Sequence, residues 1–212
     1  AFENKGITQV TIPSSITTIG TNAFFGSKLA AVEIPGTVTT IENSAFEQCT
    51  AWTKVTFVDP AKSGGGASTT TIASRAFASC DNLVTLKLTG SISSIGPEAF
   101  KSCGLGRVII WGGTSSVGKD AFSMCVKLKE IVIANSSAAT PGSLTGCKNL
   151  NAVHYGSDTP PSADSLPDGF PAEKLHRVNV ERSVGTATCT ESASIREKIS
   201  CTVSTCSFSY ND

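Results

Sequence analysis

The chain has 212 residues, of which 40% are hydrophobic and 16% are charged, so it can bury a sizeable core and does not have the composition of a disordered polypeptide. Seventeen basic and seventeen acidic side chains leave no net charge, which disfavours nucleic acid and acidic membranes as partners because polyanions normally select a basic excess. No apolar run approaches 18 residues, and the sequence begins without Met, secretory signal or transit peptide, so we expect a processed chain or a fragment with no membrane-inserted segment.

A small residue followed by a large apolar one recurs along the chain. The copies are Ala1-Phe2, Ala23-Phe24, Ala45-Phe46, Ala76-Phe77, Ala99-Phe100 and Ala121-Phe122, with degenerate copies at Ser143-Leu144 and Gly169-Phe170. Successive copies are 22, 22, 31, 23, 22, 22 and 26 residues apart. Five residues before the Phe of the pair stands a second apolar column, formed by Ile19, Ile41, Ile72, Ile95 and Val117. Columns that stay in phase over eight copies indicate a stack of structural repeats.

A short run with alternating apolar residues follows each pair. Examples are Val10-Thr11-Ile12, Val32-Glu33-Ile34, Ile131-Val132-Ile133 and Val178-Asn179-Val180. Each run predicts a strand of three to five residues whose first and third side chains face inward. Because one coil cannot bury its own apolar edge, we predict a right-handed repeat solenoid of α/β type, with short parallel strands, loops and 3-10 turns around a spine of Phe side chains. A helix bundle is the rival fold, and the β-branched residues, Pro13 and Pro35 argue against it.

The repeat carries a family resemblance. Residues 10–20 followed by Ala23-Phe24, and residues 38–41 followed by Ala45-Phe46 and Cys49, resemble the BspA-like leucine-rich repeat, whose pattern is similar to LxxVxIPxxVTxIGxxAFxxC. The resemblance covers roughly residues 1–182, although Ala139, Leu144 and the Pro-rich residues 159–161 depart from the pattern. Members of this family are typically cell-surface or secreted proteins of bacteria and protists that engage other proteins, so the resemblance implies that role.

The solenoid is expected to span residues 1–182 and to be interrupted by one insertion. The 31-residue step places a Gly-rich insertion at about residues 59–70, which belongs on the surface as a loop. Lys62 precedes the three glycines, so the segment does not match a phosphate-binding loop. The chain starts partway through a repeat, and no polar cap precedes the first coil. Residues 183–212 do not contain the repeat and are expected to cover the last coil.

The eight cysteines fall into two groups. Five of them lie three residues after successive spine positions and are predicted to be buried free thiols, namely Cys49, Cys80, Cys103, Cys125 and Cys147. The other three, Cys189, Cys201 and Cys206, lie in the tail, where one disulfide is expected; a further link to Cys147 stays open. Zinc is disfavoured because no C-x-x-C occurs and the chain has only two histidines, so we expect no metal and no cofactor.

The sequence offers little for catalysis. His154 is expected at an outward strand position as an exposed side chain, His176 before the next strand, and no G-x-S-x-G elbow is present. The carboxylates map to separate coils without a paired column, so we predict that the chain is not an enzyme. Asn135 begins an Asn-x-Ser sequon after a strand and is a candidate glycosylation site if a eukaryote secretes the chain.

The candidate partner-binding residues come from the outward strand positions. The predicted central outward column is Thr11, Glu33, Thr56, Lys87, Ile109, Val132, His154 and Asn179. Trp111 and Ala134 stand two residues beyond this column and would cluster with Ile109 and Val132 outside the core. Charged neighbours Arg107 and Glu130, with His154, would form the rim of this hot spot. The alternative is that the insertion, a tail segment or a register slip covers Trp111.

Two functions therefore remain open. The favoured hypothesis is a non-enzymatic cell-surface or secreted module for protein binding or adhesion, whose partner is a host, neighbouring-cell or extracellular-matrix protein. The alternative is a structural subunit of an extracellular filament, built by head-to-tail stacking of copies through the uncapped coil. An enzyme that uses His154 is the third and weakest hypothesis.

Overall fold

The computed structural model describes residues 2–58, 69–89, 92–111, 114–134, 142–156 and 160–177, followed by the strands 179–183, 186–190, 198–202 and 205–209. At residues 89, 111, 134 and in these last four strands, only the backbone is described. The predicted insertion at residues 59–70 falls almost wholly outside the described residues, and so does Asn135.

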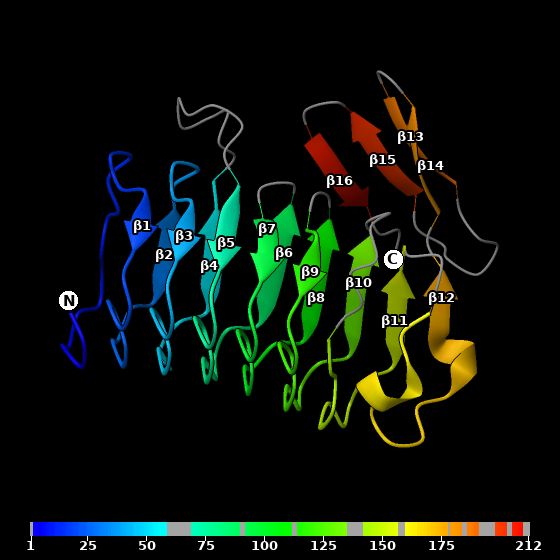
Figure 1. Ribbon diagram of the computed structural model, residues 1–212, viewed down its shortest axis with the longest axis horizontal. Helices are drawn as coiled ribbons and strands as arrows, with labels where there is room; N and C mark the ends of the chain where they lie inside the picture. The colour runs from blue at the N-terminus through cyan, green and yellow to red at the C-terminus, as the bar shows by residue number, and fades with distance from the viewer. Residues whose placement is uncertain are drawn as a thin grey trace.

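The described chain winds into stacked coils that carry two parallel sheets (Figure 1). The larger sheet consists of β2 (Ala31–Ile34), β4 (Lys54–Phe57), β6 (Thr85–Thr89), β8 (Arg107–Trp111), β10 (Glu130–Ala134), β11 (Ala152–Tyr155) and β12 (Leu175–Arg177). The smaller sheet consists of β1 (Thr18–Ile19), β3 (Thr40–Ile41), β5 (Thr70–Ile72), β7 (Ile92–Ile95) and β9 (Ser116–Val117). The predicted solenoid of short parallel strands is therefore confirmed, and its right-handed sense stays a prediction.

The helical content is small. The described residues contain two 3-10 helices, Ala163–Ser165 and Ala172–Lys174, and no α-helix, so the helical layer that an α/β class implies is missing from them. Across the part of the chain that the structure describes, no helix is long and apolar enough to cross a membrane.

The smaller sheet explains the second apolar column of the sequence. Its register pairs Ile19 with Ile41, Ile41 with Ile72, and Ile95 with Val117. Each strand has only two to four residues, and a turn begins two residues after its end. The column was predicted as apolar, but its strands were missed, since two residues are too few for a period of two to be recognised.

The ends of the larger sheet differ from the prediction. The expected first strand, Val10-Thr11-Ile12, is not a strand, so the sheet begins at β2. In the last coil the strand is Leu175–Arg177, and His154 pairs with His176 rather than with Asn179. The predicted strand of the last coil was displaced by three residues, because the alternating run that begins at Val178 was taken as the strand. The inward residue that packs against the core is instead Leu175. Asn179 instead opens an antiparallel sheet.

That antiparallel sheet contains β13 (Asn179–Ser183), β14 (Thr186–Thr190), β15 (Lys198–Thr202) and β16 (Thr205–Ser209), in this order. Strand pairing thus changes from parallel to antiparallel between Arg177 and Asn179, slightly before the boundary predicted at residue 182.

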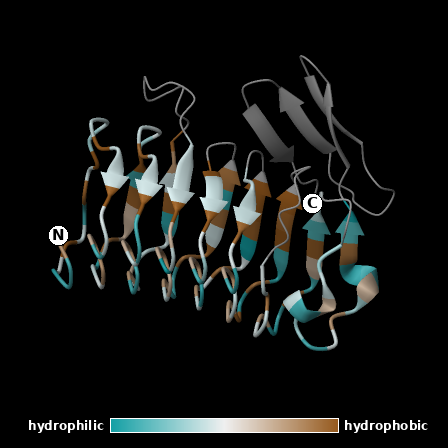
Figure 2. Cartoon of the chain, viewed as in Figure 1, coloured by the Kyte–Doolittle hydropathy of each residue, from teal (hydrophilic) through white to brown (hydrophobic). Residues whose placement is uncertain are grey.

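The Phe spine is confirmed. Consecutive rings stack with centroids 5.6 Å apart for Phe2 and Phe24, 5.1 Å for Phe24 and Phe46, 5.3 Å for Phe46 and Phe77, 5.0 Å for Phe77 and Phe100, and 5.4 Å for Phe100 and Phe122. Leu144 continues the column and is fully buried. Brown, hydrophobic segments recur from coil to coil in Figure 2. Ala45, Ala76, Ala99 and Ala121, each of which precedes a ring, are also fully buried, which lets the backbones of successive coils approach closely.

A ladder of thiols runs beside the spine. Each Sγ donates a hydrogen bond to the carbonyl oxygen of the spine Phe one coil earlier, at 3.2 Å for Cys49, 3.3 Å for Cys80, 3.0 Å for Cys103, 3.2 Å for Cys125 and 3.2 Å for Cys147. All five are buried free cysteines, as predicted. Burial raises the pKa of the Cys147 thiol to about 11, so the group stays protonated and able to donate.

Two positions in most coils adopt a left-handed backbone. One precedes the small residue of the pair, as at Ser44 (φ 55°), and the other lies two residues after the ring, as at Gln48 (φ 60°). Between them the Phe46 N–H donates to the Ala76 carbonyl of the next coil at 2.8 Å. A non-Gly residue in this region costs about 1–2 kcal/mol, so the stacking of neighbouring coils must hold these turns.

Truncating the spine should destabilise the whole stack. We expect Phe77→Ala to lower the free energy of unfolding by about 3–5 kcal/mol, because it removes a fully buried ring and leaves a cavity. Urea denaturation followed by circular dichroism measures the change. Phe2→Ala is the matched control, since that ring is 48% exposed and should lose far less. Equal losses at both positions would contradict a continuous buried spine.

Two neighbouring coils approach so closely at Gly104 that a side chain there would collide with the backbone of the other coil. A Cβ added there would lie 1.9 Å from the Asp81 carbonyl oxygen, whereas one added at Gly106 would lie 3.8 Å from its nearest neighbour, the Val84 oxygen. We expect Gly104→Ala to cost about 1–3 kcal/mol or more by overpacking and Gly106→Ala to leave the midpoint of thermal unfolding almost unchanged. Identical melting curves for the two variants would disprove the close contact.

Candidate functional site

The larger sheet has one face against the core and one face that turns away from it, here called the outward face. Its central column runs through Glu33, Thr56, Lys87, Ile109, Val132, His154 and His176, and the column before it through Ala31, Lys54, Thr85, Arg107, Glu130 and Ala152. The inward residues between the two columns, such as Val108 and Ile131, belong to the hydrophobic core. The predicted alternation along these strands is therefore confirmed from β2 to β11.

The outward face is divided into an open half and a covered half. On β2, β4 and β6, the side chains of Ala31, Glu33, Lys54, Thr85 and Lys87 are exposed. On β8 and β10, Ile109 is only 1% exposed and Val132 only 4%. These two residues are not members of the core cluster, so they are buried on the outward side of the sheet.

The structure describes the exposure of part of the predicted hot spot. Ile109 and Val132 lie outside the core as expected, but the expectation that they are accessible to a partner was wrong, because other atoms cover them. Trp111 and Ala134 are paired in the register of β8 and β10, while their side chains lie outside the described residues. Their part in partner binding stays a prediction.

The charged rim forms one cluster on the covered half. Arg107 Nε lies 2.8 Å from Glu130 Oε2, and His154 Nε2 lies 3.1 Å from Glu130 Oε1. The His154 and His176 rings stack with centroids 5.0 Å apart. The predicted exposed histidine was wrong, since the His154 side chain is 12% exposed. The sequence analysis did not predict that His154 lies beside His176, because it placed the strand of the last coil three residues too late. Leu175, the apolar residue that begins this strand, could have indicated the correct register.

Electrostatics in this cluster favour an ionised carboxylate. The hydrogen bond from His154, assisted by the charge of Arg107, holds the pKa of Glu130 below its ordinary value of 4.5 although burial acts in the opposite direction. The pKa of His176 is lowered from 6.5, first by burial and then by the neighbouring His154. Both groups therefore oppose protonation in the folded state.

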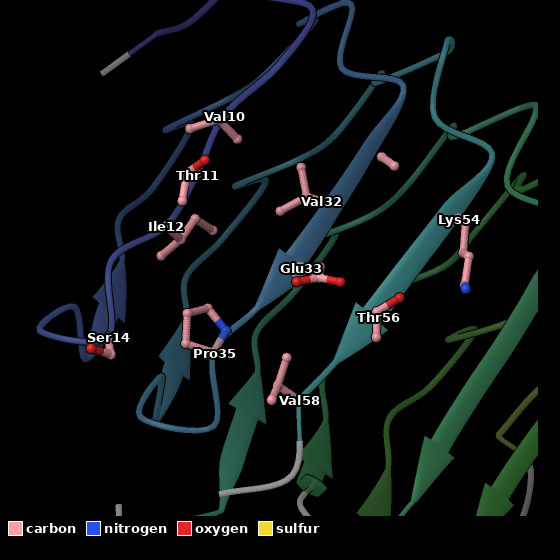
Figure 3. Close-up of a pocket in the computed structure, with 11 residues that line it drawn as sticks. Val10, Thr11, Ile12, Ser14, Val32, Glu33, Pro35, Lys54, Thr56 and Val58 are labelled. Atoms are coloured by element: carbon pink, nitrogen blue, oxygen red, sulfur yellow. The ribbon is translucent and has the colours of Figure 1, made fainter. Parts of the chain in front are cut away.

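The open half ends in a hollow of about 410 Å³ between the first coil and the first strands (Figure 3). Val10, Thr11, Ile12 and Ser14 line one side, and Ala31, Val32, Glu33, Pro35, Lys54, Thr56 and Val58 line the other. The hollow exists because Val10-Thr11-Ile12 does not pair with β2. Apolar walls beside one acidic and one basic side chain suit contact with a polypeptide. The sequence did not predict this hollow, because it predicted a paired strand there.

The described residues give no support for a metal centre. Within the described ranges, no group of three or more His, Cys, Asp or Glu side chains is arranged to hold a metal ion. Glu47, Arg75 and Glu98 form another charged group, in which Arg75 Nε donates to Glu47 Oε2 at 3.1 Å and Arg75 Nη1 lies 3.4 Å from Glu98 Oε2. These contacts join neighbouring coils at their turns and have a structural role.

The stacked coils, their two parallel sheets and their Phe spine define a solenoid of the leucine-rich repeat class. The family model described as the BspA type leucine rich repeat region, with 6 copies, matches residues 1–66 and 66–160. The chain belongs to this family. The family and its structural neighbours are typically non-enzymatic.

Comparison with the solved structure of a bacterial leucine rich repeat protein supports the same fold. The leucine rich repeat protein of T. pallidum has a TM-score of 0.61 and 24% sequence identity, over 78% of this chain and 78% of that one. The pneumococcal vaccine antigen PcpA has a TM-score of 0.43 and 15% identity, over 81% of this chain and 66% of that one. A search among curated proteins gave no match.

The Glu130 contacts should make stability fall in acid. The pKa of this carboxyl is lower in the folded protein, so the unfolded chain binds the proton more tightly. The stabilisation by ionised Glu130 is therefore present above about pH 4.5. It is lost as the pH falls through the lower pKa of the folded state. We expect Glu130→Gln to flatten this part of the pH dependence, measured by urea unfolding between pH 3 and 7 (about the range where carboxylates titrate). An unchanged slope in the variant would show that Glu130 does not contribute.

Proposed function

We propose that this chain is a non-enzymatic, cell-surface or secreted module that binds another protein through the open half of its outward face. The observation that carries the proposal is the side-by-side placement of exposed Glu33, Lys54 and Lys87 with the hollow at the first strands. Repeated strands hold these side chains on a rigid sheet, so little ordering entropy is lost on binding. Family membership supports the protein-binding role, since leucine-rich repeat proteins of this kind commonly bind proteins.

The proposed contact surface differs from the one that the sequence favoured. Lys54 and Glu33 stand at the rim of the hollow, where a partner can pair with both charges while apolar side chains enter between Ile12 and Val58. Charged rims mainly set orientation and association rate, and buried apolar contacts supply most of the affinity. The partner proposed is therefore a protein with an apolar protrusion flanked by charges of both signs.

Substitution of the rim should separate binding from folding. We expect the double variant Glu33→Ala, Lys54→Ala to reduce capture of the partner by about tenfold or more, equivalent to about 1.4 kcal/mol, with an unchanged thermal unfolding curve. Capture is measured by pull-down from the native surroundings of the protein, followed by quantitative mass spectrometry. The control Glu3→Ala, Lys127→Ala removes the same charges from exposed turns outside the sheet. Equal capture by both variants would sink the proposed surface.

A surface or secreted location is proposed together with a disulfide in the tail. The register of β15 and β16 places Cys201 directly opposite Cys206, and the Cα separation of opposite residues, about 4.5–5.5 Å, lies within the range for disulfides. Peptide mapping of the unreduced protein should detect a Cys201–Cys206 link and no link among the five buried cysteines of the solenoid. Free thiols at both tail positions in protein isolated from its source would contradict an oxidising location.

A further inference from the structure

The burial of Ile109 and Val132 requires a cover on the outward face. Their neighbour in the same column, Lys87 on β6, is exposed, so the cover ends between β6 and β8. Toward the C-terminal edge of the sheet, His154 is 12% exposed, and Ala152 is half-buried. The covered half therefore extends from β8 toward β12.

The chain segments near this region can be distinguished by length and position. A cover that started from the insertion after β4 would have to cross β6, yet Lys87 is exposed there. Gly142 follows Ile133 by nine residues, whereas Asp120 follows Ile110 by ten at the equivalent positions of the previous coil. The connection after β10 is therefore too short to contain an additional covering segment. The 35 residues from position 178 onward follow β12, the edge strand next to His154, and they are long enough.

The antiparallel sheet formed by this segment has two unlike faces. Its register places Val180, Ala187, Cys189, Ile199, Cys201, Cys206 and Phe208 at positions of one face, together with Arg182. The positions of the other face are Asn179, Glu181, Ser183, Thr186, Thr188, Thr190, Lys198, Ser200, Thr202, Thr205, Ser207 and Ser209. A single sheet with one apolar face needs a second layer to bury that face.

We propose that the C-terminal segment of this chain, residues 178–212, docks the apolar face of its antiparallel sheet onto Ile109 and Val132. The two surfaces match because apolar residues stand at the positions of both. Stacked sheets pack about 10 Å apart, which suits an interlocked layer of such side chains. The tail thereby closes the covered half to other proteins and leaves the open half as the accessible surface.

Photo-crosslinking in the full chain tests which segment forms the cover. With p-benzoylphenylalanine at position 132, we expect crosslinked peptides from residues 178–212 of the same chain, identified by mass spectrometry. The same probe at the exposed position 87 is the control and should give at least about tenfold less of these crosslinks. Isotope-labelled and unlabelled chains are mixed, so that crosslinks to a second copy can be recognised. Crosslinks from position 132 to residues 59–68, to residues 135–141 or mainly to a second copy would overturn the proposal.

A charge at the interface provides an independent test. Val132→Asp should release the tail and increase its cleavage by a protease at least about tenfold, because burying an unpaired carboxylate is unfavourable, while residues 2–177 stay resistant. Lys87→Asp introduces the same group on the exposed part of the column and should leave cleavage at the wild-type rate. If the Val132→Asp variant does not fold, the Val132→Thr variant is compared with Lys87→Asp instead, because it introduces a smaller, uncharged polar group at the same site. Wild-type cleavage of the tail in a folded Val132→Asp or Val132→Thr protein would refute docking at this position.

Discussion

The structure depends on contact between equivalent residues of successive coils. Phe rings stack at 5.0–5.6 Å, and beside them each thiol donates to the carbonyl of the previous spine Phe. No coil can satisfy these groups alone, and the left-handed turns at residues such as Ser44 and Gln48 cost energy that only the neighbours offset. Stability is therefore shared between coils, and a segment such as Val10-Thr11-Ile12, which does not pair with β2, receives less of it.

This architecture produces a long sheet whose outward side chains are free to vary. Inward positions such as Val108 and Ile131 are fixed by the core, whereas the outward column changes from charged Glu33 and Lys87 to apolar Ile109 and Val132. That change divides one continuous sheet into an exposed, polar half and a buried, apolar half. A polar surface with a hollow can meet a partner repeatedly without aggregation, while an apolar surface must be covered to keep the protein soluble.

Most of the candidate site was predictable in position but not in accessibility. The period of two correctly placed Glu33, Lys87, Ile109, Val132 and His154 on the outward side, because alternation is a local property of a strand. Exposure depends on what lies above the strand, and that is decided by segments distant in the sequence. For the same reason the hollow was missed: it results from a strand that failed to pair, which no local pattern reveals.

The sequence by itself determined the repeat, its family and the residues of the spine and thiol ladder, since each is repeated in phase and errors at one copy are corrected by the others. Only the tertiary structure decided the second sheet, whose strands are too short to have a pattern, and the pairing of His154 with His176 in the degenerate last coil. It also decided which outward residues meet water, because burial is a property of the assembled layers and not of any one strand.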